Sequence, residues 1–309
     1  MEKINLANQE KEIEELVLKV EHKLNSPYVP SNIYGFGKHL KEYGFFPDSL
    51  PLCIYMDHGI TFADKIPPHE INNDAPCMFK FSPRLVKIYK SVSDKPCYPL
   101  PSPYVFYRRK NKITVNSNAE GTIIFPAHST PDLDDLTDWK EYMNELNQLP
   151  GEYKPITICL HENDIKKGLH KLFLSSGFKV TTAGAIMDAR FTERFYYILR
   201  QHKYSVSNLI GSYAFYSVEM GIPFTLYGKG PVYFNKNDPN IEKGNYTSYK
   251  TETYNYAKKL FTGFQYEVTN EQKKIVSYEL GLTEGIGRLK TALLLYKSFF
   301  IYRLRNRSV

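Results

Sequence analysis

The sequence predicts an α/β protein with two domains. A chain of 309 residues is too long for one ordinary hydrophobic core and fits two. In its second half, short apolar segments alternate with amphipathic ones, as in βαβ units with a parallel sheet. Polar residues follow the apolar segments, at the strand ends where such sheets bind ligands. We place one domain at residues 1–115, a second at 116–280 and a C-terminal helix at 281–309.

The first domain is predicted from less regular patterns than the second. An amphipathic helix is expected at 7–24, with one face formed by Ile13, Leu16, Val17 and Val20. A short apolar strand within 50–56 follows, and residues 78–90 read as a strand and then a helix. The Pro-rich segment 95–112 is expected to be an edge strand and the linker between the domains.

The second domain alternates regularly between the two patterns. Its expected strands lie within residues 121–130, 154–164, 178–184, 204–208 and 222–228. Its expected helices cover residues 135–149, 165–177, 190–202 and 212–221. The second of these helices ends at Gly177, where glycine is the preferred residue after a helix.

The formal charge of +7 suits an anionic partner, such as a nucleotide, an acidic glycan, a membrane surface or nucleic acid. The basic residues are spread along the chain, apart from a basic C-terminus, and form no Arg-rich arm. Zinc-finger spacing is also absent, so we expect no nucleic-acid partner. The 25 Tyr against one Trp suit a sugar-binding surface, although the codon usage of an AT-rich genome explains them equally well.

A cytoplasmic location is expected from the cysteines and the N-terminus. No CxxC pair occurs, and Cys53 and Cys159 lie in apolar segments as small hydrophobic residues. The charged N-terminus carries no signal sequence, and no apolar run is long enough to span a bilayer. The apolar and basic C-terminal helix either contacts the cytoplasmic face of an anionic inner membrane or packs across both domains and returns towards the first.

Polar residues follow or end five predicted strands, which favours a ligand cleft over chance. They are Asp57 and His58; His128, Ser129 and Thr130; His161 and Glu162; Thr181, Thr182 and Gly184; and Ser207 and Asn208. In parallel sheets the carboxyl ends of the strands meet at one edge. Each group taken alone has a structural explanation, because loops are polar in any protein.

The segment from Ser207 to Gly228 predicts a phosphate site. Gly211 lets the backbone approach a ligand, and the helix that begins at Ser212 offers unpaired N–H groups to an anion. Glu219 lies two turns along the same face, where its carboxylate could accept from ribose hydroxyls. The alternative is that Ser212 caps the helix and Glu219 is a surface charge.

The pattern VSNLIGSYAFYSVEMGIPFTLYG resembles the donor-binding half of GT-B glycosyltransferases from bacterial capsule and lipopolysaccharide clusters. It also resembles, more distantly, the bacterial sialyl-, polysialyl- and Kdo-transferases. In those enzymes a His after one strand and a Ser pair at a helix start hold the phosphate of a CMP-sugar. The matching positions here are His161, Ser212 and Ser217, with Tyr213 inside the pattern. Glu162 stands where those families usually have Pro.

This resemblance, over about residues 119–230, implies a GT-B-like fold with two Rossmann-like domains whose parallel sheets face a central cleft. It implies transfer of a sugar from a nucleotide-activated donor to a glycan or lipid-linked acceptor of a surface polysaccharide. The first domain would bind the acceptor and the second the nucleotide. We expect inverting, metal-independent chemistry, because no metal-ligand spacing occurs in the sequence. We expect no cofactor, because the nucleotide-sugar is a substrate. The alternatives are a non-catalytic glycan-binding or assembly protein and a GT-B-type sugar-nucleotide epimerase.

Two groups of residues are candidates for the chemistry. We expect Asp57 to be the base that deprotonates the acceptor, with His58 orienting it or contacting the donor, and the reverse roles stay open. His128 and His161 are expected to stabilise the charge on the phosphate that leaves. The structural alternatives are a tight turn at Asp57-His58-Gly59 and histidines that serve only their loops.

Other classes of site find little support in the sequence. The His residues show no HxxxH, HxH or HExxH spacing, so we expect no metal. The acidic segment 132–135 resembles a DxD metal motif but more simply caps the following helix. Walker, GxGxxG and GxSxG motifs are absent, which argues against P-loop, dinucleotide-binding and hydrolase proteins.

Overall fold

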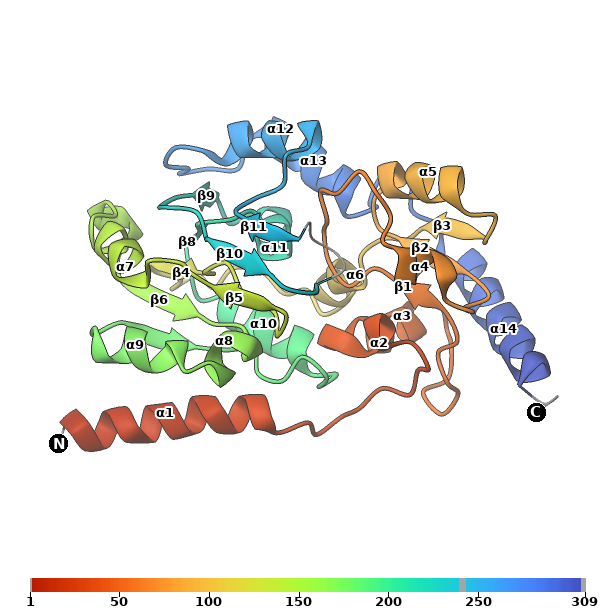
Figure 1. Cartoon of the computed structure of the whole chain (residues 1–309), viewed down its shortest axis with the longest axis horizontal. Helices are drawn as coiled ribbons and strands as arrows, with labels where there is room; N and C mark the ends of the chain where they lie inside the picture. The colour runs from red at the N-terminus through yellow and green to blue at the C-terminus, as the bar shows by residue number, and fades with distance from the viewer. Residues whose placement is uncertain (1, 239–242, 307–309) are drawn as a thin grey trace. The chain divides into compact units, whose positions relative to one another are not determined.

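The computed structural model describes residues 2–238 and 243–306, and the chain divides into two compact units (Figure 1). Unit 1 consists of Met1–Lys19, Thr114–Ala185 and Glu193–Lys273. Unit 2 consists of Val20–Ile113, Ile186–Thr192 and Lys274–Val309. Each unit contains its own parallel sheet with flanking helices. The predicted α/β class with two parallel sheets is therefore confirmed.

The two units do not follow the order of the chain: its first helix packs in unit 1 and its last helix in unit 2. Helix α1 (Glu2–Leu18) lies in unit 1, because Ile13 and Val17 fill part of its core. Helix α14 (Arg288–Arg305) lies in unit 2. The predicted helix at 7–24 ends at Leu18, and Leu16 and Val20 are 41% and 43% exposed. Only two of the four residues on its predicted apolar face are therefore buried.

The main sheet of unit 1 is five-stranded and parallel, in the order β7-β6-β4-β8-β9. Numbered along the chain, this order is 3-2-1-4-5, as in Rossmann folds. The direction of winding reverses between β4 and β8, and such sheets bind ligands outside the carboxyl ends of the strands at this reversal. The strands are β4 (Thr122–Ile124), β6 (Ile156–Cys159), β7 (Lys179–Thr181), β8 (Tyr204–Ser207) and β9 (Phe224–Leu226).

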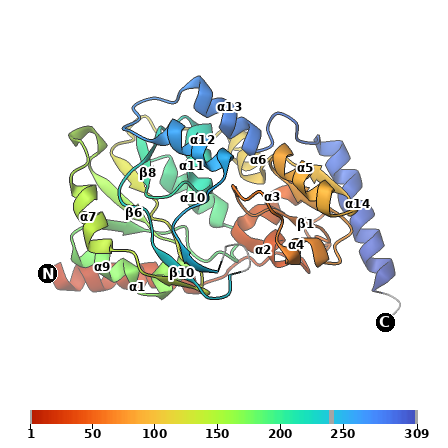
Figure 2. The same cartoon turned by 45° about the horizontal axis from the view of Figure 1, so that its top comes forward.

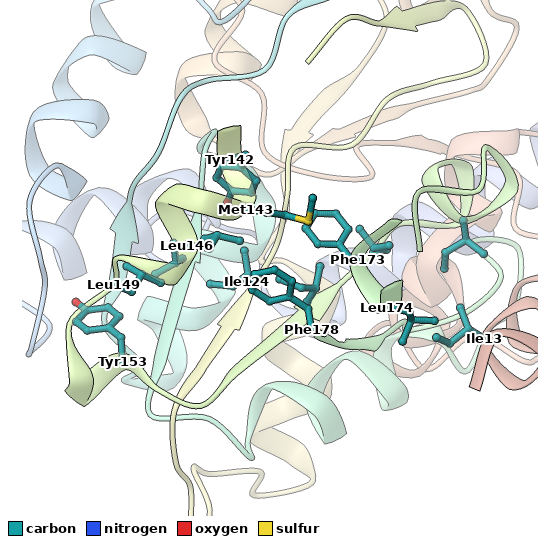
Figure 3. Close-up of a cluster of buried hydrophobic side chains, with 14 of the residues drawn as sticks. Ile13, Ile124, Tyr142, Met143, Leu146, Leu149, Tyr153, Phe173, Leu174 and Phe178 are labelled. Carbon is teal, nitrogen blue, oxygen red and sulfur yellow. The ribbon is translucent and has the colours of Figure 1, made fainter. Parts of the chain in front are cut away.

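Helices cover both faces of this sheet because its strands are apolar on both sides. On one face, Ile124 packs with Phe173 and with residues of α7 (Figure 3), and Ile158 belongs to the same buried cluster. On the other face, Phe125 stacks on Tyr213, with ring centroids 5.0 Å apart. The first face is covered by α1, α7 (Trp139–Asn147), α8 (Glu162–Lys166) and α9 (Leu169–Ser175). The second is covered by α10 (Phe191–Leu199), α11 (Ser212–Met220) and α12 (Glu252–Phe261).

The bounds of two helices in unit 1 differ from the predicted ones. The one expected at 165–177 is split at Gly168, whose φ of +84° interrupts the helix between α8 and α9. Gly177 has φ +84° and follows Ser176, the C-cap of α9, so it ends the helix as predicted. The one expected at 135–149 begins at Trp139, and its cap is Asp138, whose Oδ1 accepts from the Glu141 N–H.

The prediction that the acidic segment 132–135 caps the following helix is wrong. It forms β5 (Leu133–Asp135), which pairs antiparallel with β10 (Tyr233–Asn235), and β10 pairs with β11 (Gly244–Tyr246). The Asp135 carboxylate accepts from the Thr137 N–H and the Trp139 Nε1–H, each at 3.0 Å. Sequence reasoning missed this small sheet because its three strands are short and far apart in the chain.

The sheet of unit 2 is parallel, in the order β1-β2-β3. Residues 95–112 contain the expected edge strand, but not a linker: they continue into a helix with Pro103 at its first position, where proline is favoured. The strands are β1 (Tyr55–Met56), β2 (Met78–Lys80) and β3 (Cys97–Pro99). The helices are α2 (Val29–Asn32), α3 (Phe36–Tyr43), α4 (Pro68–Asn72), α5 (Pro83–Val92), α6 (Pro103–Lys110) and α14, with a 3-10 turn at Ile33–Gly35.

Two further elements complete the chain. Helix α13 (Asn270–Glu279) begins in unit 1 and ends in unit 2. A second 3-10 turn, Gly151–Tyr153, precedes β6 in unit 1.

The chain after α13 covers the carboxyl ends of β2 and β3. The Ser102 N–H donates to the Leu280 carbonyl at 2.9 Å, and Gly281 adopts φ +69°. A Cβ at Gly281 would lie 2.4 Å from the Leu100 carbonyl oxygen and 2.6 Å from that of Phe81. Only glycine allows the chain to pass this close to the two strand ends.

Gly281→Ala is therefore expected to destabilise the protein strongly. The left-handed backbone costs an alanine about 1 kcal/mol or more, and overpacking against fixed carbonyls adds about 1–3 kcal/mol. Gly263→Ala is the matched control, because Gly263 has φ +84° with no atom near its missing Cβ. Denaturant unfolding should show the larger loss for Gly281→Ala, and equal losses would contradict the close approach.

Candidate functional site

Two histidines meet at the carboxyl edge of the unit 1 sheet. His128 follows β4 and His161 follows β6, and these strands are neighbours in register, with Ile124 opposite Ile158. Their rings stack with centroids 4.2 Å apart and planes at 19°. The sequence placed both residues at strand ends, and the structure brings them into direct contact beside the reversal of winding.

The geometry of His161 fixes where its proton lies. Its Nδ1 accepts from the Asn163 N–H at 3.2 Å and caps α8. The neutral ring therefore carries its hydrogen on Nε2. Burial lowers the pKa of His161 well below its ordinary value, and the charges of His128 and Lys166 add to this. An anion against the ring pair would oppose both effects, because it favours the protonated form.

This shift predicts how acid changes stability. The folded pKa of His161 lies below its ordinary value of 6.5, so below that pH the unfolded chain takes up a proton that the folded chain does not. The free energy of unfolding should fall as the pH drops from 6.5, with a slope from this group of about 1.4 kcal/mol per pH unit at most. His161→Asn keeps a helix-capping side chain and should lose this component in paired unfolding titrations. An unchanged acid slope in the variant would assign the effect to other groups.

Ser129 anchors the loop after β4. Its side chain is fully buried, and its N–H and hydroxyl donate to Asp164 Oδ1 at 3.1 and 2.9 Å. The Lys167 ammonium donates to Ser129 Oγ at 2.8 Å and to the carbonyls of Thr130 and Leu133. With these bonds Ser129 serves the loop that carries His128, and the predicted phosphate contact by Ser129 finds no support here.

Further contacts hold the strand ends at the reversal. Thr130 Oγ1 donates to Asp238 at 3.0 Å. Asn208 Oδ1 accepts from the Ala127 N–H at 2.9 Å, which joins the end of β8 to the end of β4. The Tyr233 hydroxyl donates to the Ala127 carbonyl at 2.8 Å. The backbone directly before His128 is therefore fixed from two sides.

The predicted phosphate helix is α11, and its residues have structural partners. A Cβ at Gly211 would lie 2.7 Å from the Tyr213 ring, so this glycine makes room for the ring that stacks on Phe125. The Tyr213 hydroxyl contacts Ser207 Oγ and donates to the Leu209 carbonyl, each at 2.8 Å. Ser217 is buried and donates to the Tyr213 carbonyl at 2.8 Å.

Ser212 and Glu219 both lie on α11, at its first and eighth residues, and are partly exposed. Gly211 precedes Ser212 at the cap position and has no side chain with which to cap the helix. Both residues of the predicted nucleotide face therefore lie on the helix that follows β8.

Two other predicted residues contribute to structure. A Cβ at Gly184 would lie 2.8 Å from the Leu16 carbonyl oxygen, so this glycine admits α1, and its φ is +86°. Its N–H donates to Thr182 Oγ1 at 3.0 Å. Glu162 is buried and pairs with Lys166 one turn along α8. Its carboxylate makes Glu162 unsuited to contact phosphate directly.

In unit 2 the Asp57 carboxylate is buried within a group of three charges. Asp57 Oδ1 accepts from Lys80 Nζ at 2.7 Å, and Oδ2 accepts from the Phe81 N–H at 3.1 Å. Lys80 also pairs with Glu70 and is 1% exposed. Burial would lower the pKa of Lys80, but the two carboxylates outweigh it and raise the pKa. An aspartate held in this way is suited to fix the loop rather than to act as a base.

His58 is the exposed member of the predicted catalytic pair. Its ring stacks on Tyr34, with centroids 6.3 Å apart and planes at 27°. Tyr34 itself adopts φ +58°, held by the Ile186 carbonyl that accepts its N–H and by Thr192, whose hydroxyl donates to its carbonyl. Arg84 donates to the Thr61 and Ala63 carbonyls, each at 2.9 Å, and so holds the loop after His58.

Sequence reasoning missed four charged residues that position these sites: Glu70, Lys80, Asp164 and Lys167. The burial of one of them, Lys80, could have been predicted. Lys80 lies in MFKF, between apolar residues of a strand, and a cation there requires a buried partner. The other three lie in ordinary polar segments, where the sequence gives no indication of burial. Within residues 2–238 and 243–306, no group of three His, Cys, Asp or Glu side chains could hold a metal ion.

Comparisons with known proteins leave the family open. No family model matches the chain, and no curated protein matches it. Among solved structures, it is similar to the wall teichoic acid polymerase TagF soaked with CDPG. The sequences are 11% identical, the match covers 97% of this chain and 95% of that one, and the TM-score is 0.41. Because that score does not establish a common fold, the function is inferred from the residues of this chain.

Proposed function

We propose that this chain is a glycosyltransferase that takes a sugar from a nucleotide-activated donor, with the nucleotide bound by unit 1. The observation that carries the proposal is the stacked pair His128 and His161 at the carboxyl edge of a sheet in Rossmann order. Both rings lie beside the reversal of winding, where sheets of this kind bind nucleotides. The exposed end of α11 lies after β8, on the other side of the reversal.

The chemistry of the pair suits a departing phosphate. When the bond between the sugar and the nucleotide breaks, negative charge grows on the phosphate oxygens. The Nε2–H of His161 is a donor that can stabilise this charge, and phosphate in turn favours protonation of the ring. The two histidines would thus act on the leaving group without a metal ion, and the carbon attacked by the acceptor would invert.

We propose that unit 2 binds the acceptor and that His58 is the base. Its ring is exposed at the end of β1, whereas the neighbouring Asp57 is committed to Lys80 and to the Phe81 N–H. Asp57 then positions the turn that presents His58. A glycan or lipid-linked acceptor of a surface polysaccharide completes the proposal, with a CMP-sugar as the first donor to test.

A thermal-shift screen against CMP, UDP, GDP, dTDP and their sugars tests the donor site. A ligand at one hundred times its dissociation constant should add about 2.7 kcal/mol to the free energy of unfolding. The shift should appear with one nucleotide and disappear in His161→Asn, which keeps the cap of α8. His22→Asn, at an exposed histidine that follows α1, is the matched control and should keep the shift.

The outcomes separate the proposal from its rivals. Absence of a shift with every nucleotide, combined with binding of a glycan, would replace the transferase with a glycan-binding protein. Turnover of a nucleotide-sugar without any acceptor would identify an epimerase. Loss of activity in EDTA that Mn²⁺ restores would overturn the metal-independent mechanism.

A further inference from the structure

Helix α14 exposes a continuous line of large apolar side chains. Leu289, Leu293, Phe300 and Leu304 are 76%, 73%, 61% and 66% exposed. With about 100° of rotation per residue, all four lie within about 60° of each other around the helix. They extend along about 22 Å of its length at 1.5 Å per residue. Figures 1 and 2 show α14 as a long blue helix at the edge of unit 2.

The side of α14 that packs on unit 2 has apolar contacts of its own, since Leu295 is buried and the Phe299 and Tyr302 rings lie near those of Phe46 and Tyr28. Its buried residues are Thr291, Leu295 and Ser298, and two of the three carry hydroxyls. Thr291 Oγ1 donates to the Gly287 carbonyl at 3.1 Å, and Ser298 contacts Cys77 Sγ at 3.5 Å. A helix that serves only a core places its large apolar residues inward. The exposed apolar residues of α14 therefore indicate that this side of the helix binds a second apolar surface.

The charges of α14 indicate what that surface is. The helix contains five basic residues, Arg288, Lys290, Lys297, Arg303 and Arg305, and no acidic residue. Lys290 and Lys297 flank the apolar line on one side, and Arg303 flanks it on the other. All three are exposed. Long basic side chains beside an apolar line reach anionic headgroups while the line enters the acyl region.

We propose that α14 docks lengthwise on an anionic lipid surface, with Leu289, Leu293, Phe300 and Leu304 inserted and the flanking basic residues on the headgroups. A straight line on a convex helix fits a planar lipid surface, and the purely basic charge complements anionic lipid. The helix lies on the surface, because no helix among the described residues meets the length and apolarity that a membrane crossing requires. This surface is separate from the His128 and His161 site and does not depend on the proposed function.

Co-sedimentation of the full chain with vesicles tests the proposal. The protein should bind vesicles that contain phosphatidylglycerol and not vesicles of phosphatidylcholine alone, and added salt should weaken the binding. Leu293→Gln with Phe300→Gln should lower the bound fraction at least about tenfold, since each change removes an inserted side chain. The matched control is Leu136→Gln with Tyr197→Gln, at positions 59% and 68% exposed in unit 1. Lys290→Glu with Lys297→Glu should abolish binding to the anionic vesicles.

Three results would overturn the proposal. One is that the unmodified chain binds neither kind of vesicle. Another is that the α14 variants bind as tightly as the unmodified chain while their unfolding temperatures are unchanged. The third is a concentration-dependent dimer in light scattering that the Leu293 and Phe300 changes abolish, with no vesicle binding, which would assign the line to a second copy of the chain.

Discussion

Lys80→Met is expected to lower the free energy of unfolding by about 3–5 kcal/mol, as found when one partner of a buried ion pair is removed. Lys80 is 1% exposed and is the cation between Asp57 and Glu70. Methionine fills a similar volume but leaves two carboxylates facing each other in a buried site. Chemical denaturation at neutral pH measures the loss. Lys65→Met, at an exposed lysine of the loop that follows β1, should change stability by less than about 0.5 kcal/mol.

The pH dependence identifies the cause of this loss. Burial raises the pKa of Glu70 above its ordinary value, the Asp57 charge adds to this, and Lys80 opposes both, so removing Lys80 should raise this pKa further. The folded variant then binds more protons than the unfolded chain, so stability is present at low pH and is lost as the pH rises through the folded pKa of Glu70. The deficit of Lys80→Met should therefore shrink between pH 7 and pH 5. Adding Asp57→Asn and Glu70→Gln should restore part of the stability at pH 7, and a deficit that stays constant with pH would point to packing alone.

His161→Asn is expected to reduce the rate of sugar transfer by about 100- to 1,000-fold, the effect of removing one preorganised donor from a developing anion. Asparagine keeps a side chain that caps α8, so the fold and the loop after β6 should be retained. The loss should appear in kcat as well as in kcat/KM, because the contact strengthens as the phosphate leaves. His128→Asn tests the stacked partner in the same assay.

The control for this experiment is His22→Asn, which changes an exposed histidine outside the site. Its rate should match that of the unmodified protein. Equal rates for His161→Asn and the unmodified protein, with the correct unfolding temperature, would remove the ring pair from the mechanism. The proposed leaving-group role would then pass to the end of α11.

The positions of the strands, and the polar residues at their ends, could be predicted from the sequence. Apolar runs such as TIIF and ITICL indicate buried parallel strands because both faces of such a sheet are covered. His128, His161 and His58 were found because each follows such a run. These signals are local, and a few consecutive residues contain them.

The hydrogen-bond and ion-pair partners of the site residues could not be predicted, because these partners come from distant parts of the chain. Nothing near Ser129 indicates that its hydroxyl bonds Asp164, and nothing near Asp57 indicates that Lys80 buries it. The interpretation of Asp57 as a base was reasonable for an aspartate at a strand end. Both oxygens of Asp57 are already bonded in the structure, which is why we propose His58 as the base.

Apolar periodicity and strand-end polarity are local properties of the chain, so the α/β class, the strand ends and the three histidines could be predicted from the sequence alone. The structure was needed to show that His128 and His161 stack, that β4 and β8 flank a reversal of winding, and that α1 packs in unit 1 although most of the first predicted domain lies in unit 2. It also decided that α14 turns its large apolar residues outward. Strand order, unit membership and the buried face of a helix depend on contacts between segments far apart in the sequence, and hydrophobic periodicity carries no record of those contacts.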